Sequence, residues 1–285
     1  MSERLVLGTV QFGLDYGISN EAGKPSESEV GAILDQAFFQ GIRCLDTADA
    51  YGTAVEVLGN YNRLHPGRFQ INSKFKGHPG QLKDHLLRSL GLLGIPAFHV
   101  YFYHSFADFM AWPELRDELA QLKQDGLIRF IGVSVYGNEE FRAVLDAGWV
   151  DVVQIPFNML DNRTQRGECL ARAHEQRVSV QARSVYLQGL FFLPLDKIPA
   201  RLLPLRPWLE EIHRLARAYD VPIQQLALHY VLQQEDIAEV VIGVDSRQQL
   251  EDHRLSPGKS LPKDLIEKVN QIRVTDTELL YPKNW

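Results

Sequence analysis

Cysteine is scarce in this chain of 285 residues. Its two cysteines, Cys44 and Cys169, have neither the spacing of a metal site nor the number that a disulfide framework needs. We therefore expect two buried thiols, no metal ion, and a protein that works in the reducing cytoplasm. The first residues, Met1 to Arg4, lead straight into a predicted strand, so we expect no signal peptide.

Long apolar runs and an excess of positive charge are also missing. No uninterrupted hydrophobic stretch is long enough to span a bilayer. The net charge is −6. This acidic balance argues against nucleic acid or an anionic membrane surface as the main partner. No predicted strand is followed by the G-x-G-x-x-G pattern, so we expect no Rossmann-type nucleotide site.

The sequence does contain a regular alternation of short apolar runs and amphipathic segments. The alternation predicts a parallel sheet covered by helices, and eight repeats favour one closed (β/α)8 TIM barrel over residues 1–285. We also expect a long loop over about 185–207 and a C-terminal helix and tail over about 262–285. The predicted strands are 5–9, 42–46, 69–74, 98–104, 128–134, 152–157, 178–183 and 240–243. The predicted helices begin near residues 26, 54, 80, 113, 138, 165, 208 and 246, with further helices over 223–234 and 263–272.

Four polar residues stand out against this pattern. Asp46, Lys74 and His104 close the second, third and fourth predicted strands, and Tyr51 follows in the loop after the second. Each alone has an ordinary explanation, such as a turn cap, a solvated lysine or a packed ring. Together at the carboxyl ends of neighbouring strands, where barrel active sites lie, they indicate a catalytic site.

The chemistry of the four groups is that of proton donation to an alkoxide. The Lys74 ammonium should stabilise the phenolate of Tyr51 and so lower the pKa of that phenol, while Asp46 holds Lys74 in place. His104 offers a donor that orients a carbonyl oxygen. Such a site needs a separate hydride source, because no side chain supplies one.

With these motifs the chain resembles the aldo-keto reductase family. The segment 46–52 (DTADAYG) looks like the strand-2 motif of that family, and Lys74 and His104 fall at its expected positions. Further similar segments are 132–134 (GVS), 153–154 (VQ) with Asn158, 225–232 (QLALHYVL) and 241–243 (VIG). The resemblance implies metal-free, NAD(P)H-dependent reduction of an aldehyde or ketone, with Tyr51 as the general acid. It covers residues 5 to about 253.

The resemblance also implies where the cofactor binds. It would lie extended across the barrel mouth, with Ser134 and Gln154 at the nicotinamide carboxamide and residues 243–253 around the adenosine. The full set of expected contacts is Thr9, Ser134, Gln154, Arg183, Leu187, Gly189, Gly243 and Arg247. The family favours NADPH, with NADH possible, because Asp245 would repel a 2′-phosphate or accept a ribose hydroxyl.

The sequence departs from the family pattern at two positions. Val135 stands where most members have asparagine, and Arg183 where many have an aromatic residue stacked on the nicotinamide. Two interpretations of Arg183 stay open: its guanidinium stacks on a ring, or it pairs with a carboxylate at the barrel rim. Tyr186 is an alternative stacking residue.

The substrate is expected to be a small carbonyl compound, and the sequence gives neither its identity nor the oligomeric state. Phe12, Tyr16 and Tyr136 are candidates for the pocket wall, and Arg201 and Arg206 for contacts with an anionic substrate.

Three other functions remain open from the sequence. The first is an NAD-dependent sugar or alcohol dehydrogenase. The second is a nucleotide-binding barrel with little turnover that serves as a regulatory or assembly subunit. The third is a lyase that uses Lys74 as a Schiff base.

Overall fold

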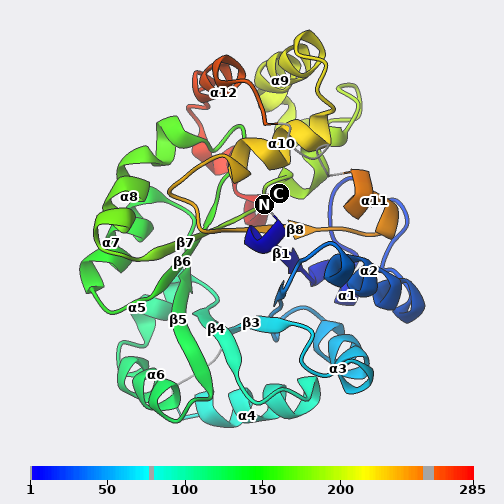
Figure 1. Cartoon of the computed structure of the whole chain (residues 1–285). Coiled ribbons are helices and arrows are strands. Elements are labelled where there is room, and N and C mark those ends of the chain that lie inside the picture. Colours follow the sequence, from blue (N-terminus) through cyan, green and yellow to red (C-terminus); the bar gives the residue numbers. More distant parts are fainter. Residues whose placement is uncertain (1, 77–79, 253–259) are drawn as a thin grey trace.

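The protein folds as one closed barrel of eight parallel strands that follow one another around the barrel in chain order (Figure 1). The computed structural model describes residues 2–76, 80–252 and 260–285. Every predicted strand is present, with ends that differ from the prediction by at most two residues, so the TIM-barrel prediction is confirmed. The strands are β1 (Leu5–Gly8), β2 (Cys44–Asp46), β3 (Gln70–Phe75), β4 (Phe98–Tyr103), β5 (Ile128–Ser134), β6 (Val152–Pro156), β7 (Ser179–Arg183) and β8 (Glu239–Gly243).

Helices cover the outside of the barrel. The first long one begins as its sequence predicts, because the Ser26 side chain accepts a hydrogen bond from the Glu29 amide and caps the helix. The predicted helices are α2 (Glu27–Phe39), α3 (Ala54–Leu64), α4 (Leu82–Leu93), α6 (Leu115–Gln124), α7 (Asn138–Ala147), α8 (Arg163–Glu175), α9 (Arg206–Ala218), α10 (Ile223–Leu232), α11 (Arg247–Asp252) and α12 (Lys263–Asn270).

Several short helices were not predicted. They are α1 (Val10–Gly13), α5 (Phe106–Ala111) and the 3-10 helices η1 (Ser2–Arg4), η2 (Leu187–Phe192), η3 (Ala200–Leu205), η4 (Thr277–Leu280) and η5 (Pro282–Asn284). Helices of one or two turns present too few residues for apolar periodicity to show. The expected loop over 185–207 is thus partly helical, as η2 and η3 lie within it.

The barrel interior combines an apolar cluster with a polar one. Val100, Phe102 and Val152 form a small apolar cluster of their own, separate from the large core between sheet and helices. The opposing residues Gln154 and Gln181 of β6 and β7 are also completely buried. Buried amides need hydrogen-bond partners, so the interior must contain a polar network.

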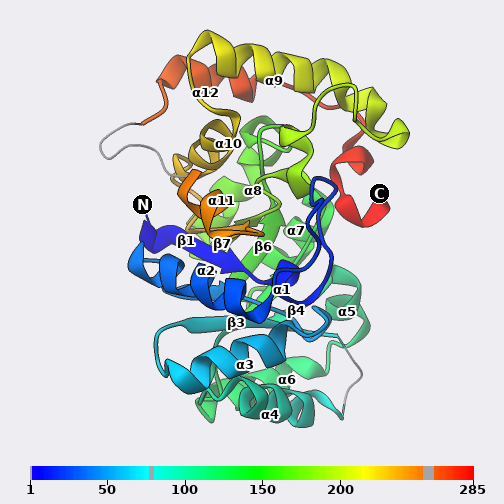
Figure 2. The same ribbon diagram turned by 90° about the vertical axis from the view of Figure 1, so that its right-hand side faces the viewer.

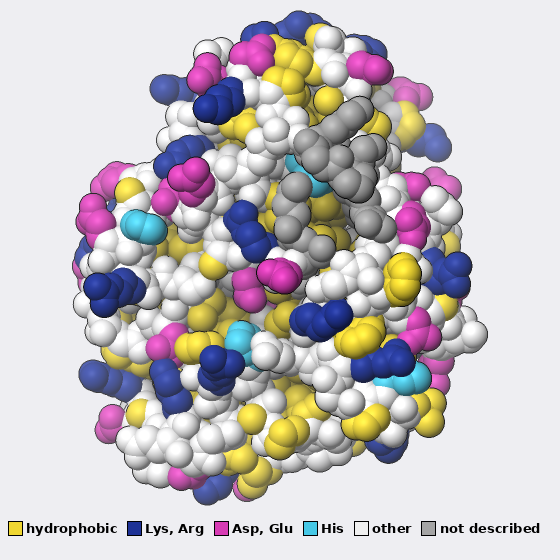
Figure 3. Space-filling model, in the orientation of Figure 1, with side chains coloured by type: hydrophobic (Ala, Val, Ile, Leu, Met, Phe, Trp, Pro, Cys, Tyr) yellow, Lys and Arg dark blue, Asp and Glu magenta, His cyan; other side chains and the backbone are white. Residues whose placement is uncertain are grey.

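The two ends of the barrel differ. Figure 2 shows the N-terminus at one end, and the loop after β1 together with the C-terminal segment at the other. On the face seen in Figure 3, basic and acidic side chains are interspersed rather than gathered by sign. No helix in the described part of the chain is both long enough and apolar enough to cross a membrane.

A close helix contact gives a stability prediction. A Cβ added at Gly59 in α3 would lie 2.0 Å from the backbone oxygen of Leu92 in α4, so Gly59→Ala must push the two helices apart. We expect it to lower the free energy of unfolding by about 1–3 kcal/mol, measured by urea denaturation. The matched control is Gly31→Ala in α2, where no atom lies within 4 Å; it should be neutral or stabilise by up to about 1 kcal/mol. Equal effects of the two substitutions would contradict the prediction.

Candidate active site

A pocket of about 540 Å³ opens at the carboxyl ends of the strands. Each strand contributes a lining residue at or near its carboxyl end: Thr9, Asp46, Lys74, His104, Ser134, Gln154, Arg183 and Gly243. Parallel strands of a barrel all end at the same face, which explains this convergence. The volume is in the usual range for small-molecule sites.

A buried ion pair lies at the base of this pocket. The Lys74 ammonium donates to Asp46 Oδ1, and the two side chains are almost fully shielded from solvent. Lys74 Nζ also donates to the Thr47 carbonyl at 3.2 Å and to the Tyr51 hydroxyl oxygen at 3.5 Å, which uses all its three protons. Burial opposes the charge on Lys74, but Asp46 and Tyr51 outweigh it and raise the pKa of Lys74, so the amine stays protonated.

Asp46 is held from its other side by the interior polar network. Gln154 Nε2 donates to Asp46 Oδ2 at 2.9 Å and also to Gln181 Oε1. Gln181 Nε2 in turn donates to Glu239 Oε2 at 2.8 Å. Both oxygens of Asp46 are therefore engaged, and the carboxylate cannot rotate without breaking a buried hydrogen bond.

Tyr51 is placed by close backbone packing. A Cβ on Gly13 would lie 1.8 Å from the Tyr51 carbonyl oxygen, and one on Gly52 would lie 2.4 Å from the Gly13 oxygen. Gly52 also has φ of +55°, a conformation that L side chains rarely adopt. Two glycines thus let α1 and the loop after β2 touch, and this contact fixes the tyrosine.

The pKa of Tyr51 differs from the expectation. Burial raises it more than the Lys74 ammonium lowers it, so the net pKa of Tyr51 lies above the ordinary phenol value. The predicted effect of Lys74 is present, but burial is larger. The phenol is therefore protonated at neutral pH and accepts a hydrogen bond from Lys74, which leaves its own O–H to be donated to a ligand.

His104 faces the same space as Tyr51. The centres of the two rings are 6.1 Å apart and the rings are nearly perpendicular. Burial, together with the positive charges of Lys74, Arg183 and Lys76, lowers the pKa of His104 to about 4. The imidazole is therefore neutral at pH 7 and can act as a hydrogen-bond donor without carrying charge.

The remainder of the pocket fits an extended dinucleotide. Gly189 and Gly243 pack closely against neighbouring side chains at its wall, since a Cβ there would lie 1.7 Å from Ser19 Oγ and 2.3 Å from Gln11 Nε2 respectively. Gln11 Oε1 and Asp245 Oδ1 are buried atoms of lining residues and have no hydrogen-bond partner among the described residues. Unpaired acceptors of this kind suit ribose hydroxyls, and close-packed glycine backbone suits a pyrophosphate.

Of the other predicted residues, Tyr16 and Tyr136 line the pocket and three do not. Phe12 is completely buried in the hydrophobic core, because α1 turns its ring inward. Leu187 is also completely buried, and the turn it starts presents Gln188 and Gly189 to the pocket instead. Arg247 is exposed at the start of α11, and its backbone amide donates to Glu29. His253 lies outside the described residues.

Arg183 makes only neutral contacts among the described residues. Its guanidinium donates to Ser134 Oγ at 3.3 Å, Ser184 Oγ at 3.3 Å and the Val135 carbonyl at 3.2 Å, and lies 4.2 Å from the centre of the Tyr136 ring. The structure thus places the guanidinium over a tyrosine ring and gives it no carboxylate partner among the described residues; its stacking on the nicotinamide stays a prediction. Arg206, expected as a possible substrate contact, instead pairs with Glu210 on the helix surface.

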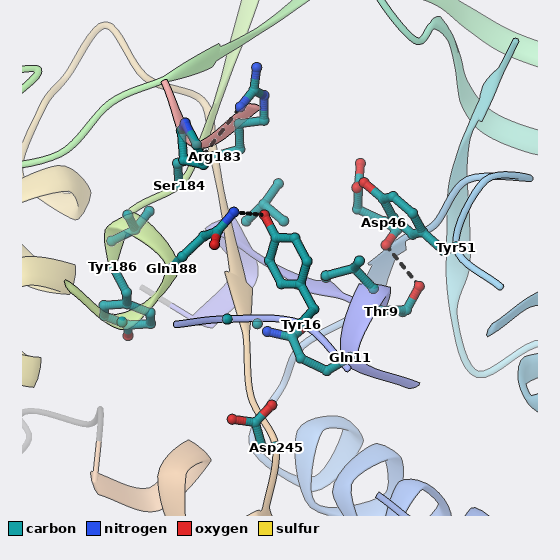
Figure 4. A pocket seen from close by; sticks show the side chains of 18 of the residues that line it. Thr9, Gln11, Tyr16, Asp46, Tyr51, Arg183, Ser184, Tyr186, Gln188 and Asp245 are labelled. Atoms are coloured by element: carbon teal, nitrogen blue, oxygen red, sulfur yellow. Dashed lines mark hydrogen bonds between the residues drawn. The ribbon is translucent and has the colours of Figure 1, made fainter. Parts of the chain in front are cut away.

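Sequence reasoning missed several lining residues, including Gln11, Ser19, Gln224 and Lys283. The Gln188 amide donates to the Tyr16 hydroxyl at 3.1 Å, across 172 residues of sequence (Figure 4). No local pattern could reveal this contact, since it depends on two loops meeting. Within the residues that the structure describes, no group of His, Cys, Asp or Glu is arranged to hold a metal ion.

Comparison with known proteins agrees with this geometry. An uncharacterized oxidoreductase of Bacillus subtilis is 25% identical over 87% of this chain and 84% of its own length. An NADH-specific methylglyoxal reductase of Escherichia coli is 27% identical over 61% of this chain and 59% of its own length.

Solved structures share the fold. An aldo-keto reductase from Bacillus halodurans superposes with a TM-score of 0.75 at 20% identity, covering 99% of this chain and 94% of that one. The model of the aldo/keto reductase family matches residues 4–273. The chain therefore belongs to the aldo/keto reductase family.

Proposed function

We propose that this protein reduces an aldehyde or ketone to an alcohol with a nicotinamide dinucleotide. The observation that carries the proposal is the buried Lys74–Asp46 pair in contact with the hydroxyl of a protonated Tyr51. Neutral His104 in the same pocket supplies a second donor for the carbonyl oxygen.

Each residue of the site has its own role in the proposed reaction. A nicotinamide coenzyme bound in this pocket would provide the hydride that the carbonyl carbon accepts. Tyr51 donates its proton to the oxygen as negative charge develops there, and becomes a phenolate. Lys74, held by Asp46, compensates that charge, and His104 orients the oxygen toward Tyr51. A proton from solvent then restores Tyr51.

The raised pKa of Tyr51 favours reduction over oxidation at neutral pH. An acid must be protonated before the reaction, and a raised pKa keeps the phenol in that form. The reverse reaction needs phenolate and should gain rate as pH rises. The same environment argues against a Schiff-base lyase, since Lys74 has a raised pKa and is a poor nucleophile while protonated.

For the coenzyme we propose NADH rather than the NADPH that the family resemblance predicts. The described charged residues lining the adenosine end of the pocket are Asp245 and Asp252, whereas Arg247 is not part of the lining. Carboxylates repel a 2′-phosphate and accept bonds from ribose hydroxyls. The NADH specificity named for the Escherichia coli relative supports this choice.

Coenzyme preference can be measured directly. Titration of the tryptophan fluorescence should give a lower Kd for NADH than for NADPH. Asp245→Asn should raise the Kd of NADH, because it removes a charged acceptor, and lower the Kd of NADPH, because it removes a repulsive charge. The ratio of the NADPH Kd to the NADH Kd should therefore fall about three- to tenfold. Asp84→Asn, which removes an exposed carboxylate on α4, should leave the ratio unchanged. Tighter binding of NADPH by the unmodified protein would refute the preference.

The role of Tyr51 can be tested by removing one oxygen. Tyr51→Phe should lower kcat for aldehyde reduction at least about 100-fold while Kd for NADH changes little, because the acid is lost and the fold is kept. Tyr101→Phe is the matched control, as that buried hydroxyl has no hydrogen-bond partner among the described residues and is not part of the pocket lining. Retention of activity by Tyr51→Phe would exclude Tyr51 as the acid.

The charge state of His104 predicts a pH dependence. Its folded pKa of about 4 lies below the ordinary 6.5, so the unfolded chain binds the proton more readily between these values. His104 should therefore make the free energy of unfolding fall as pH drops from about 6.5 to about 4. An NMR titration of labelled histidine should give a midpoint near 4 for the signal that disappears in His104→Gln. A midpoint near 6.5 would show that the imidazole is solvated and can become cationic.

A further inference from the structure

The charged residues lining the pocket are separated by sign. Lys74 is paired with Asp46, which leaves Arg183 and Lys283 near Tyr136 and the acids Asp245 and Asp252 at the adenosine end. Figure 4 shows Arg183 and Asp245 on opposite sides of the Tyr16 and Gln188 side chains. The catalytic side of the pocket is therefore positively charged.

Arg183 is not neutralised by the described residues around it. The carboxylate with which it interacts at longer range is Asp161, and both oxygens of Asp161 are taken by Arg166, with N–O distances of 2.6 Å. The acceptors that Arg183 has are two hydroxyls and one carbonyl. A partly buried guanidinium without a charged partner has capacity for a strong bond to an anion.

Lys283 is brought to the same place by the C-terminal segment. Tyr281 packs edge-on against Tyr136, with ring centres 5.2 Å apart, and the Trp285 indole donates to the Leu279 carbonyl at 3.0 Å. These contacts place the Lys283 ammonium 4.2 Å from the centre of the Tyr136 ring.

Both cations thus lie against one aromatic ring. Glu140 accepts a hydrogen bond from the Tyr136 backbone amide but does not line the pocket. Two like charges beside one ring repel each other, and an anion bound close to both would reduce that cost.

Arg183 also lies within electrostatic reach of Tyr51 and His104. Arg183 lowers the pKa of Tyr51 and of His104, although burial is the larger influence on each. A ligand whose carbonyl reaches Tyr51 would therefore bring a nearby negative group to Arg183 and Lys283.

We propose that Tyr136, Arg183 and Lys283 form an anion subsite, and that the substrate is a carbonyl compound carrying a carboxylate or phosphate. This inference rests on the proposed reductase function and narrows its substrate class. Its residues are not the arginines that the sequence offered for an anionic substrate; of those, Arg206 pairs with Glu210 on the surface.

The test compares two para-substituted benzaldehydes, the anionic 4-carboxybenzaldehyde and the neutral methyl 4-formylbenzoate. The rate is followed by the loss of NADH absorbance. The kcat/KM should be at least about tenfold higher for the carboxylate than for the ester, because the carboxylate makes two charged contacts. Lys283→Gln should lower kcat/KM for the carboxylate about fivefold more than for the ester. Lys263→Gln, an exposed lysine on α12, should change neither. Equal kcat/KM for both aldehydes, or an equal loss for both in Lys283→Gln, would overturn the subsite.

A binding measurement separates this inference from the proposed reaction. Calorimetry with 4-methylbenzoate on the NADH-loaded protein should show binding that 4-methylbenzamide lacks and that weakens in Lys283→Gln and in high salt. If neither aldehyde is reduced but the benzoate binds in this way, the reductase proposal fails and the anion subsite stands. If both aldehydes are reduced but the benzoate does not bind, the subsite fails and the reductase proposal stands.

Discussion

The buried pair of Lys74 and Asp46 is the interaction on which the site depends. Neither charge would be tolerated alone in the barrel interior, since an unpaired buried charge costs several kcal/mol. Each is therefore held by the other and by further hydrogen bonds, from Gln154 on one side and to the Thr47 carbonyl on the other. Because these partners come from the barrel itself, the rigid sheet sets the position of the ammonium beneath Tyr51.

The strands of the barrel fix where several site residues lie, and the connecting segments add further side chains to the site. The eight strand ends bring together residues that are distant in sequence, and the loop after β2 adds the tyrosine through a glycine-to-glycine contact with α1. The C-terminal segment then lies over Tyr136 and adds a lysine to the rim. The sheet thus positions Asp46, Lys74 and Arg183, while segments outside it add Tyr51 and Lys283.

The sequence was sufficient to predict the fold and the meeting of three candidate residues in one pocket, for a physical reason. Strands of a parallel barrel end at one face, so Asp46, Lys74 and His104 had to converge once the strands were located. What failed depended on packing between segments far apart in sequence. Phe12 was assigned to the pocket wall because nothing local shows that α1 turns it into the core. The sequence also could not predict that the pKa of Tyr51 is raised, since the amount of burial is a property of the folded chain.

The interior network has a consequence for how the pocket recognises a ligand. A glutamine amide has two N–H donors and one carbonyl oxygen, and Gln154 commits its nitrogen to Asp46 and Gln181. Asp46, which is paired with the Lys74 ammonium, accepts this bond and so fixes which way the amide is turned. The Gln154 oxygen accepts a hydrogen bond from Ser134 Oγ, 3.4 Å away, at the pocket wall. At this point the pocket wall presents a hydrogen-bond acceptor, so a ligand group that contacts it must be a hydrogen-bond donor.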